Sequence, residues 1–271
     1  MKDILKAPFL TEFCDIADNM YRMGWDERNG GNISLILDPE EVKQYLDLDT
    51  VKKWIPITFH AVDLAGKIFL VTGTGKYFRN VLKKPADCLG IIKVAEDGKS
   101  IGILWGFEDG GRPTSELPAH FMSHIERLKV DPKHRIVIHT HATNVVAMTF
   151  VHDLSEREFT RTLWQMCTEC LVVFPDGVGV LPWMLCGNDE IGRATAEKMK
   201  EYRLVVWGQH GIFGTGRDID EAFGLIETVE KAAEIYIKVM NHEIKQSITD
   251  EQLWILANAF HVTPKEGFLN K

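Results

Sequence analysis

The sequence has no run of 18 or more apolar residues, so it predicts no helix that spans a membrane. Residues 1–21, MKDILKAPFLTEFCDIADNMY, mix acidic side chains into the apolar positions and show no signal-peptide pattern. Cysteine is scarce, with five in 271 residues, and the odd number and the spacing argue against a disulfide scaffold. These absences together predict a protein of the reducing cytoplasm.

An excess of positive charge is also missing. The 39 Asp and Glu outnumber the 31 Lys and Arg, and the formal net charge is −8. A nucleic-acid surface needs clustered Lys and Arg, so we predict neither a nucleic-acid nor a membrane partner. An anionic substrate would need a local site made of backbone N–H groups, dipoles or a metal ion.

Internal repeats, low-complexity tracts and Pro- or Ser-rich linkers are absent as well, which predicts a single domain over residues 1–271. Apolar periodicity predicts helices near 9–23, 115–129, 142–151, 156–167, 188–201, 219–240 and 249–260. Thr249 and Gln252 have the spacing of a capping box at the start of the last helix.

Short β-branched and apolar runs predict strands near 32–37, 67–72, 88–95, 100–105, 135–140, 171–174, 204–207 and 212–215. Asp97-Gly98 is a hairpin signal between two of them. A regular β–α–β alternation is missing, so neither a TIM barrel nor a Rossmann fold is favoured. We predict an α/β three-layer αβα sandwich whose central sheet is mainly antiparallel.

The sharpest local feature of the sequence is the segment Arg135–His141, RIVIHTH. A β-branched run ends on His139 and His141, and residues at i and i+2 leave the same face of a strand. That spacing lets one cation be held by a rigid element. Unrelated hydrolases share the pattern, and two histidines alone could equally be core or surface residues.

A third histidine, His210, changes that balance. It lies in Gly208-Gln209-His210-Gly211, where two glycines suit a tight turn that projects the imidazole from a sheet end. Three neutral imidazoles with an open fourth position are typical of catalytic zinc. The remaining histidines show no such pairing, and we predict surface or packing roles for them.

Two glycine-rich turns provide candidate anion sites. They are Asn29-Gly30-Gly31-Asn32 and Thr72-Gly73-Thr74-Gly75-Lys76. Glycine permits the positive φ angles that aim successive N–H groups at one anion. Neither turn has the spacing of a nucleotide-binding loop, and each alone could be merely structural.

The segment Pro113–His120, PTSELPAH, predicts a helix start with Ser115 as N-cap and with Glu116 and Pro118 in the first turn. Such a terminus can also favour an anion. On local grounds Glu116 is better explained by the helix dipole than by catalysis.

Together these segments resemble the class II aldolase/adducin family. The resemblance rests on WDERNGGN (25–32), VTGTGKYFRN (71–80), PTSELPAHFMSHIERL (113–128), HTHATN (139–144), TECLVVFPDGVGVLPW (168–183), DEIG (189–192) and GLIETVEKAAEI (224–235). These motifs extend over nearly the whole sequence. The resemblance implies a zinc-dependent aldolase that cleaves a phosphorylated ketose, built on a central antiparallel sheet between helices.

The resemblance also implies roles for individual residues. Zinc would be held by His139, His141 and His210, and Glu116 would be the acid/base. The substrate phosphate would be bound by Asn29, Gly31, Asn32, Thr74 and Ser115. Thr74 stands where similar members have Ser, and both offer a hydroxyl. Glu169 would reach the site of a neighbouring subunit in a cytoplasmic homotetramer with four-fold symmetry.

Several alternatives use the same residues. A fuculose- or ribulose-phosphate aldolase, or a ribulose-5-phosphate 4-epimerase, would share the metal and phosphate sites, although SELPAH and PDGVGVLPW favour a different aldolase branch. A non-catalytic adducin-like module would not need three histidines with Glu116. A metal-dependent hydrolase would want further ligands near HTHATN, which offers none.

Overall fold

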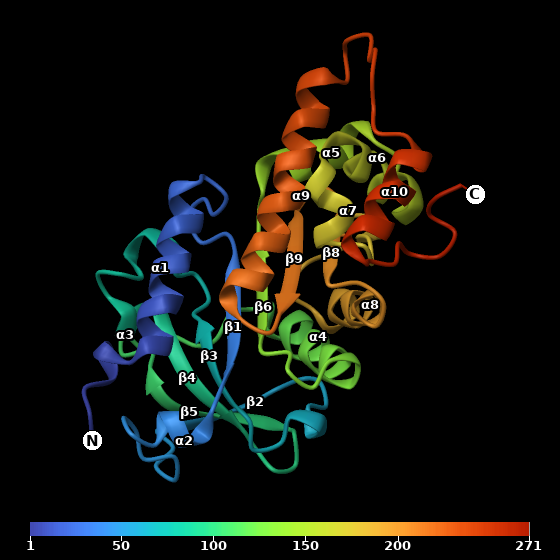
Figure 1. Cartoon of the computed structure of the whole chain (residues 1–271). Coiled ribbons are helices and arrows are strands. Elements are labelled where there is room, and N and C mark those ends of the chain that lie inside the picture. The colour runs from blue at the N-terminus through green and yellow to red at the C-terminus, as the bar shows by residue number, and fades with distance from the viewer. Residues whose placement is uncertain (271) are drawn as a thin grey trace.

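A nine-stranded mixed sheet forms the centre of the computed structural model, which describes residues 1–270 (Figure 1). The strands are β1 (Asn32–Leu37), β2 (Lys53–Pro56), β3 (Ile68–Thr72), β4 (Leu89–Val94), β5 (Ser100–Gly106), β6 (Ile136–Thr140), β7 (Gly179–Leu181), β8 (Leu204–Trp207) and β9 (Gly211–Gly216). Their order is β2-β5-β4-β3-β1-β6-β9-β8-β7. Only the edge pair β7–β8 is parallel, so the prediction of a mainly antiparallel sheet is confirmed.

Ten α-helices surround this sheet in residues 1–270. They are α1 (Pro8–Arg22), α2 (Pro39–Val42), α3 (Pro85–Cys88), α4 (Leu117–Val130), α5 (Thr143–Val151), α6 (Glu156–Met166), α7 (Thr168–Val173), α8 (Asp189–Met199), α9 (Ile219–Val239) and α10 (Asp250–Phe260). None of them is long and apolar enough to be a membrane span. The capping box of α10 is present, since Thr249 Oγ1 accepts from Gln252 N and Gln252 Oε1 accepts from Thr249 N.

The helices form a layer on each side of the sheet. The pair α4 and α8 pack on each other and on β6, β7 and β8, whereas α9 lies along β9 and β6 and packs on α5 and α1 (Figure 1). Strand alternation divides the side chains between these layers: Ile136 and Ile138 join the core on the α1 and α9 side, and Val137 joins the core on the α4 and α8 side. His139 shares the face of Val137, so it points toward α4.

One predicted strand, residues 171–174, is wrong, because Leu171-Val172-Val173 belongs to the helix α7. A four-residue apolar run does not distinguish a buried strand from a buried helix. In the fold α7 packs on α6, α9 and α10, which gives its apolar residues a helical environment. Two strands were not predicted: β2 is largely exposed and ends at Pro56, and β7 has only three residues.

The start of α4 also differs from the prediction. The helix begins at Leu117, and the N-cap position is occupied by Glu116, not by Ser115. Glu116 makes no capping hydrogen bond; instead its backbone N–H donates to Thr114 Oγ1 at 3.2 Å. The carboxylate is thereby free to point into the protein.

Candidate metal centre

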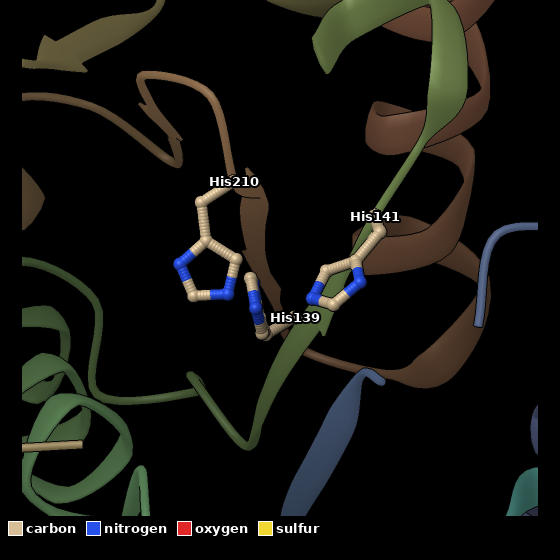
Figure 2. Close-up of side chains that lie close together, drawn as sticks. All are labelled: His139, His141 and His210. Atoms are coloured by element: carbon tan, nitrogen blue, oxygen red, sulfur yellow. The ribbon is translucent and has the colours of Figure 1, made fainter. Parts of the chain in front are cut away.

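Three imidazoles converge at one end of the sheet, and they are the three that the sequence predicted. His139 lies in β6, His141 follows the strand directly, and His210 lies in the turn between β8 and β9. One ring nitrogen of each lies within 4.8 Å of the corresponding nitrogen of the other two, and Figure 2 shows the rings facing a common space. We call these residues the histidine trio.

His139 is fully buried and stacks on Phe213, with ring centroids 4.3 Å apart. Its Nδ1–H donates to the carbonyl of Ile212 at 3.1 Å, which leaves the Nε2 lone pair free. That Nε2 has no hydrogen-bond partner among residues 1–270, although it is buried. Burial holds the pKa of His139 well below its usual value, so the ring is neutral. A buried, unpartnered lone pair of this kind fits a metal ligand.

His141 is oriented by Glu27, which the sequence analysis did not single out. The Glu27 carboxylate oxygens lie 3.0 and 3.1 Å from His141 Nδ1, so that nitrogen donates and Nε2 is left for a metal. Carboxylate–histidine pairs of this type orient the imidazole ligands of metal sites. The turn approaches closely here, since a Cβ on Gly30 would lie 2.8 Å from His141 Nδ1, and one on Gly31 would lie 1.7 Å from the Asp26 carboxylate.

His210 is held by the three-residue turn between β8 and β9. Gln209 has a positive φ of 56° and binds Thr149 of α5 through its backbone N–H and its side-chain amide. A Cβ on Gly211 would lie 2.4 Å from the carbonyl of Thr140, so only glycine lets the turn sit this close to β6. Burial lowers the pKa of His210 to about 4, which keeps the imidazole neutral at pH 7.

Glu116 borders this trio. Its carboxylate is 3.5 Å from His139 Nε2 and 3.8 Å from His210 Nε2, and Asn32 Nδ2 donates to it at 2.8 Å. Burial raises the pKa of Glu116, while the Asn32 hydrogen bond and the charge of His141 act in the opposite direction. Of the competing effects on this carboxyl group, burial is the largest.

Cys186 also lies at this site and was not predicted. Its Sγ, one nitrogen of His210 and one oxygen of Glu116 all lie within 4.8 Å of one another. The residue is exposed, in the loop before α8. The sequence around Cys186 contains no metal-ligand motif, so nothing there predicts that the residue lies at the site.

The predicted phosphate residues lie on neighbouring segments. Asn29 and Gly31 lie in the turn that leads into β1, and Thr74 follows β3. Thr74 N–H donates to the carbonyl of Arg112 at 2.9 Å, which brings the Thr74 loop beside the segment that carries Ser115. Ser115 is exposed and lines a cavity of about 700 Å³ together with Arg112 and Arg193.

Asn32 differs from the other predicted phosphate residues. Its Nδ2 donates to Glu116, and its Oδ1 contacts His120 Nε2. Its Oδ1 and one N–H of its Nδ2 therefore have partners within the protein, and the second N–H remains available as a donor to phosphate.

Glu169 is not brought to the trio by any of its hydrogen bonds or ion pairs within residues 1–270. It is exposed on α7, and its carboxylate accepts a hydrogen bond from Cys167 Sγ at 3.0 Å. This hydrogen bond lowers the pKa of Glu169.

Comparison with known proteins agrees with this geometry. The sequence model of the family described as Class II Aldolase and Adducin N-terminal domain matches residues 11–237. A rhamnulose-1-phosphate aldolase of Listeria monocytogenes is 62% identical over 99% of both chains, and one of Enterococcus faecalis is 59% identical over 99% of this chain and 97% of its own. A sugar-phosphate aldolase structure from Thermotoga maritima, 29% identical, covers 88% of this chain and 97% of its own with a TM-score of 0.74. The chain therefore belongs to the class II aldolase/adducin family.

Proposed function

We propose that the protein is a zinc-dependent aldolase that reversibly cleaves L-rhamnulose 1-phosphate to dihydroxyacetone phosphate and L-lactaldehyde in rhamnose catabolism. The observation that carries the proposal is the convergence of three imidazoles beside a buried carboxylate. The high identity to relatives named rhamnulose-1-phosphate aldolase, over nearly the whole of both chains, supports the choice of substrate. The segments SELPAH and PDGVGVLPW support the same choice.

The residues suit the proton transfers of this reaction. Cleavage breaks the C3–C4 bond, removes the proton of the C4 hydroxyl and leaves the bonding electrons on C3, next to the C2 carbonyl. A divalent cation on His139, His141 and His210 would act as a Lewis acid toward the carbonyl and hydroxyl oxygens. The Glu116 carboxylate would accept the proton that leaves the C4 hydroxyl and deliver a proton to C3, and both transfers would reverse in the direction of synthesis, which places a carboxyl group of raised pKa where protons are exchanged.

We infer that the phosphate is bound by Asn29, Gly31, Asn32, Thr74 and Ser115. The turns offer backbone N–H groups, hydroxyls and an amide in a protein of net charge −8. The variants Asn29→Ala and Thr74→Ala should raise KM for the phosphorylated ketose and leave the weak reaction of the unphosphorylated ketose nearly unchanged. Equal losses for both substrates would assign these loops to the fold alone.

We also propose that the whole chain acts as one aldolase domain in a cytoplasmic homotetramer, with Glu169 contributing to the site of a neighbouring subunit. This role rests on the family resemblance and on the exposure of Glu169 on α7. Co-expression of Glu116→Gln with Glu169→Ala should restore activity, because mixed oligomers contain some sites with both glutamates. Verified mixed oligomers without activity would remove the proposal.

The activity is tested by giving the zinc-loaded protein L-rhamnulose 1-phosphate, L-fuculose 1-phosphate and ribulose 5-phosphate in parallel. We expect the two ketose 1-phosphates to release dihydroxyacetone phosphate, fastest from the first. Ribulose 5-phosphate carries its phosphate on C5 and cannot release this product, so it is assayed for conversion to its C4 epimer, xylulose 5-phosphate. A preference for either of the other two substrates would assign the protein to that activity instead. Borohydride should trap no protein–substrate adduct, and a Schiff base trapped on any lysine would overturn the metal mechanism. The lysine of the Thr74 loop, Lys76, is ion-paired with Asp109.

A further inference from the structure

A row of buried polar side chains begins at the Glu116 carboxylate and runs between β1 and α4. We call this row the polar ladder, and its members are Asn32, Ser34, His120, His124 and His134. None of the five is more than 7% exposed. Burying polar groups costs free energy unless each finds a hydrogen-bond partner, so five in a row require an explanation beyond packing.

The ladder is continuous in its contacts. Asn32 connects Glu116 to His120, as described above. Ser34 Oγ lies 2.7 Å from His120 Nδ1 and 2.8 Å from His124 Nε2. His124 Nδ1 lies 2.7 Å from His134 Nε2. Both ring nitrogens of His120 and of His124 therefore have a partner.

The proton on each ladder nitrogen follows from Glu116. Because Asn32 Nδ2 donates to the carboxylate, Asn32 Oδ1 must accept, and His120 must carry its proton on Nε2. The bare Nδ1 of His120 then accepts from the Ser34 hydroxyl, whose oxygen accepts from His124 Nε2–H. The bare Nδ1 of His124 in turn accepts from His134 Nε2–H. Every donor thus points toward Glu116.

Burial keeps these imidazoles in the neutral form that this order requires. Desolvation lowers the pKa of His120 and of His134 to about 3, and it lowers that of His124 well below its usual value. A neutral imidazole has one N–H and one lone pair, so each ring donates at one nitrogen and accepts at the other, which gives the row of hydrogen bonds a single direction.

Two periodicities place the ladder. Glu116, His120 and His124 are spaced by four residues at the N-cap and along α4, and they share one face of the helix. Asn32 and Ser34 are spaced by two in β1 and share one face of the strand. The strand residues alternate with the helix residues, so each of the two strand residues contacts two residues of the Glu116–His124 segment.

We propose that the polar ladder positions the Glu116 carboxylate for proton transfer, with His120 and Ser34 as positioning residues. An Asn32 amide whose oxygen already accepts from His120 cannot rotate by half a turn without losing both hydrogen bonds. It therefore fixes the carboxylate through Glu116 Oε2, so that both oxygens face the trio: Oε2 lies 3.5 Å from His139 Nε2, and Oε1 lies 3.8 Å from His210 Nε2. This inference rests on the proposed role of Glu116.

A matched pair of variants separates positioning from packing. In His120→Gln the amide nitrogen can replace Nε2 as the donor to Asn32, whereas in His120→Asn the shorter side chain replaces Nδ1 and leaves Asn32 without a donor. We expect kcat to fall by about 10- to 100-fold in His120→Asn, the scale of a small misplacement of a catalytic group, and to recover largely in His120→Gln. KM and bound zinc should stay within about twofold in both. His152→Asn, which removes a ring bonded to Thr162 outside the ladder, is the control and should keep the parent kcat.

The proton order is tested separately by solid-state ¹⁵N NMR of the zinc-loaded protein with labelled histidine. We expect His120, His124 and His134 each to carry the proton on Nε2, with the signals assigned by single variants. Protons on Nδ1 in these rings would overturn the proposal. If a His120 variant does not fold, Ser34→Ala breaks the ladder with a smaller change in volume and should lower kcat in the same way.

The outcomes distinguish this inference from the function on which it rests. Normal proton exchange with solvent in Glu116→Gln would overturn the proposed role of Glu116, on which the inference rests. Loss of exchange in Glu116→Gln together with a parent kcat in His120→Asn and Ser34→Ala would overturn the positioning role alone.

Discussion

The protein contains two groups of three histidines that differ in what their ring nitrogens meet. In the histidine trio, the second nitrogens of His139 and His141 are fixed by Ile212 and Glu27, and the remaining nitrogens face one another. In the polar ladder, the partners of His120, His124 and His134 are the Asn32 amide, the Ser34 hydroxyl and one another.

The difference shows that the partner, not the residue type, decides the role of a buried histidine. Burial lowers the pKa of His139 and His210 in the trio and of His120, His124 and His134 in the ladder, so these five imidazoles are neutral at pH 7. A neutral imidazole with an unpartnered lone pair can bind a metal ion, whereas one with both nitrogens hydrogen-bonded, as in His120 and His124, can only orient its neighbours. Four experiments test this division, from the largest expected effect to the smallest.

Replacing His210 with alanine should empty the metal site and abolish activity, because two imidazoles do not hold zinc tightly enough. His124→Gln, which removes a ladder imidazole, should retain one zinc per chain. Elemental analysis of both purified variants checks this. Full zinc in His210→Ala would show that the metal lies elsewhere.

Glu116→Gln should retain zinc and bind dihydroxyacetone phosphate. It should lose about 10²- to 10⁴-fold in the exchange of the C3 proton of that ligand with deuterated solvent, because the amide cannot take up a proton. NMR of the ligand in D₂O measures the exchange rate. The parent rate in this variant would reduce Glu116 to its N-cap position, where an acid is worth about 0.3–1 kcal/mol of stability.

Glu27→Gln should weaken zinc affinity by about 10- to 100-fold, since the residue orients His141 and raises its basicity. Competition with a coloured chelator gives the dissociation constant. Glu12→Gln, an exposed change on α1, serves as the control. Unchanged affinity in Glu27→Gln would mean that packing against Gly30 suffices to orient the ring.

Acid should destabilise the protein through the ladder. Its histidines have folded-state pKa values below the unfolded value of 6.5, so the unfolded chain binds more protons, and stability is lost as pH falls from 6.5 toward about 3. Each such histidine contributes about 1.4 kcal/mol per pH unit in this window. His134→Gln should remove the contribution of one histidine to the pH dependence of the free energy of unfolding. Urea unfolding of the metal-free protein between pH 4 and 7 measures this dependence. Parallel slopes would show that His134 titrates normally in the folded state.

The trio could be predicted from the sequence because its signal is local. Two histidines at i and i+2 after a β-branched run, and a third between glycines, each carry the geometry in a few residues. The same holds for seven long helices and for the capping box at Thr249. The segment 171–174 and the short edge strands β2 and β7 could not be assigned, because tertiary neighbours decide between helix, strand and loop there.

The polar ladder was missed for a different reason. The sequence predicts only packing or surface roles for His120 and His124, since no pattern near them indicates a partner. Their partners Asn32 and Ser34 are 88 and 90 residues away in the relevant pairs, on β1. The spacing of four in one segment and of two in another is visible in the sequence, but nothing there shows that the segments lie together.

The repeat distances along the helix and along the strand of the polar ladder differ slightly. Four residues of α-helix advance about 6 Å, and two residues of β-strand advance about 6.6 Å, so the two scales drift apart by about 0.6 Å per rung. Over the rungs from Glu116 to His124 the offset stays within the tolerance of side-chain hydrogen bonds. The next residues at these spacings are Leu128 in α4 and Ile36 in β1. Both are apolar and join the hydrophobic cluster around Phe69 and Phe121. A single-residue insertion between Glu116 and His124 would turn the following histidine by about 100° around the helix, so this stretch of α4 should tolerate no change in length.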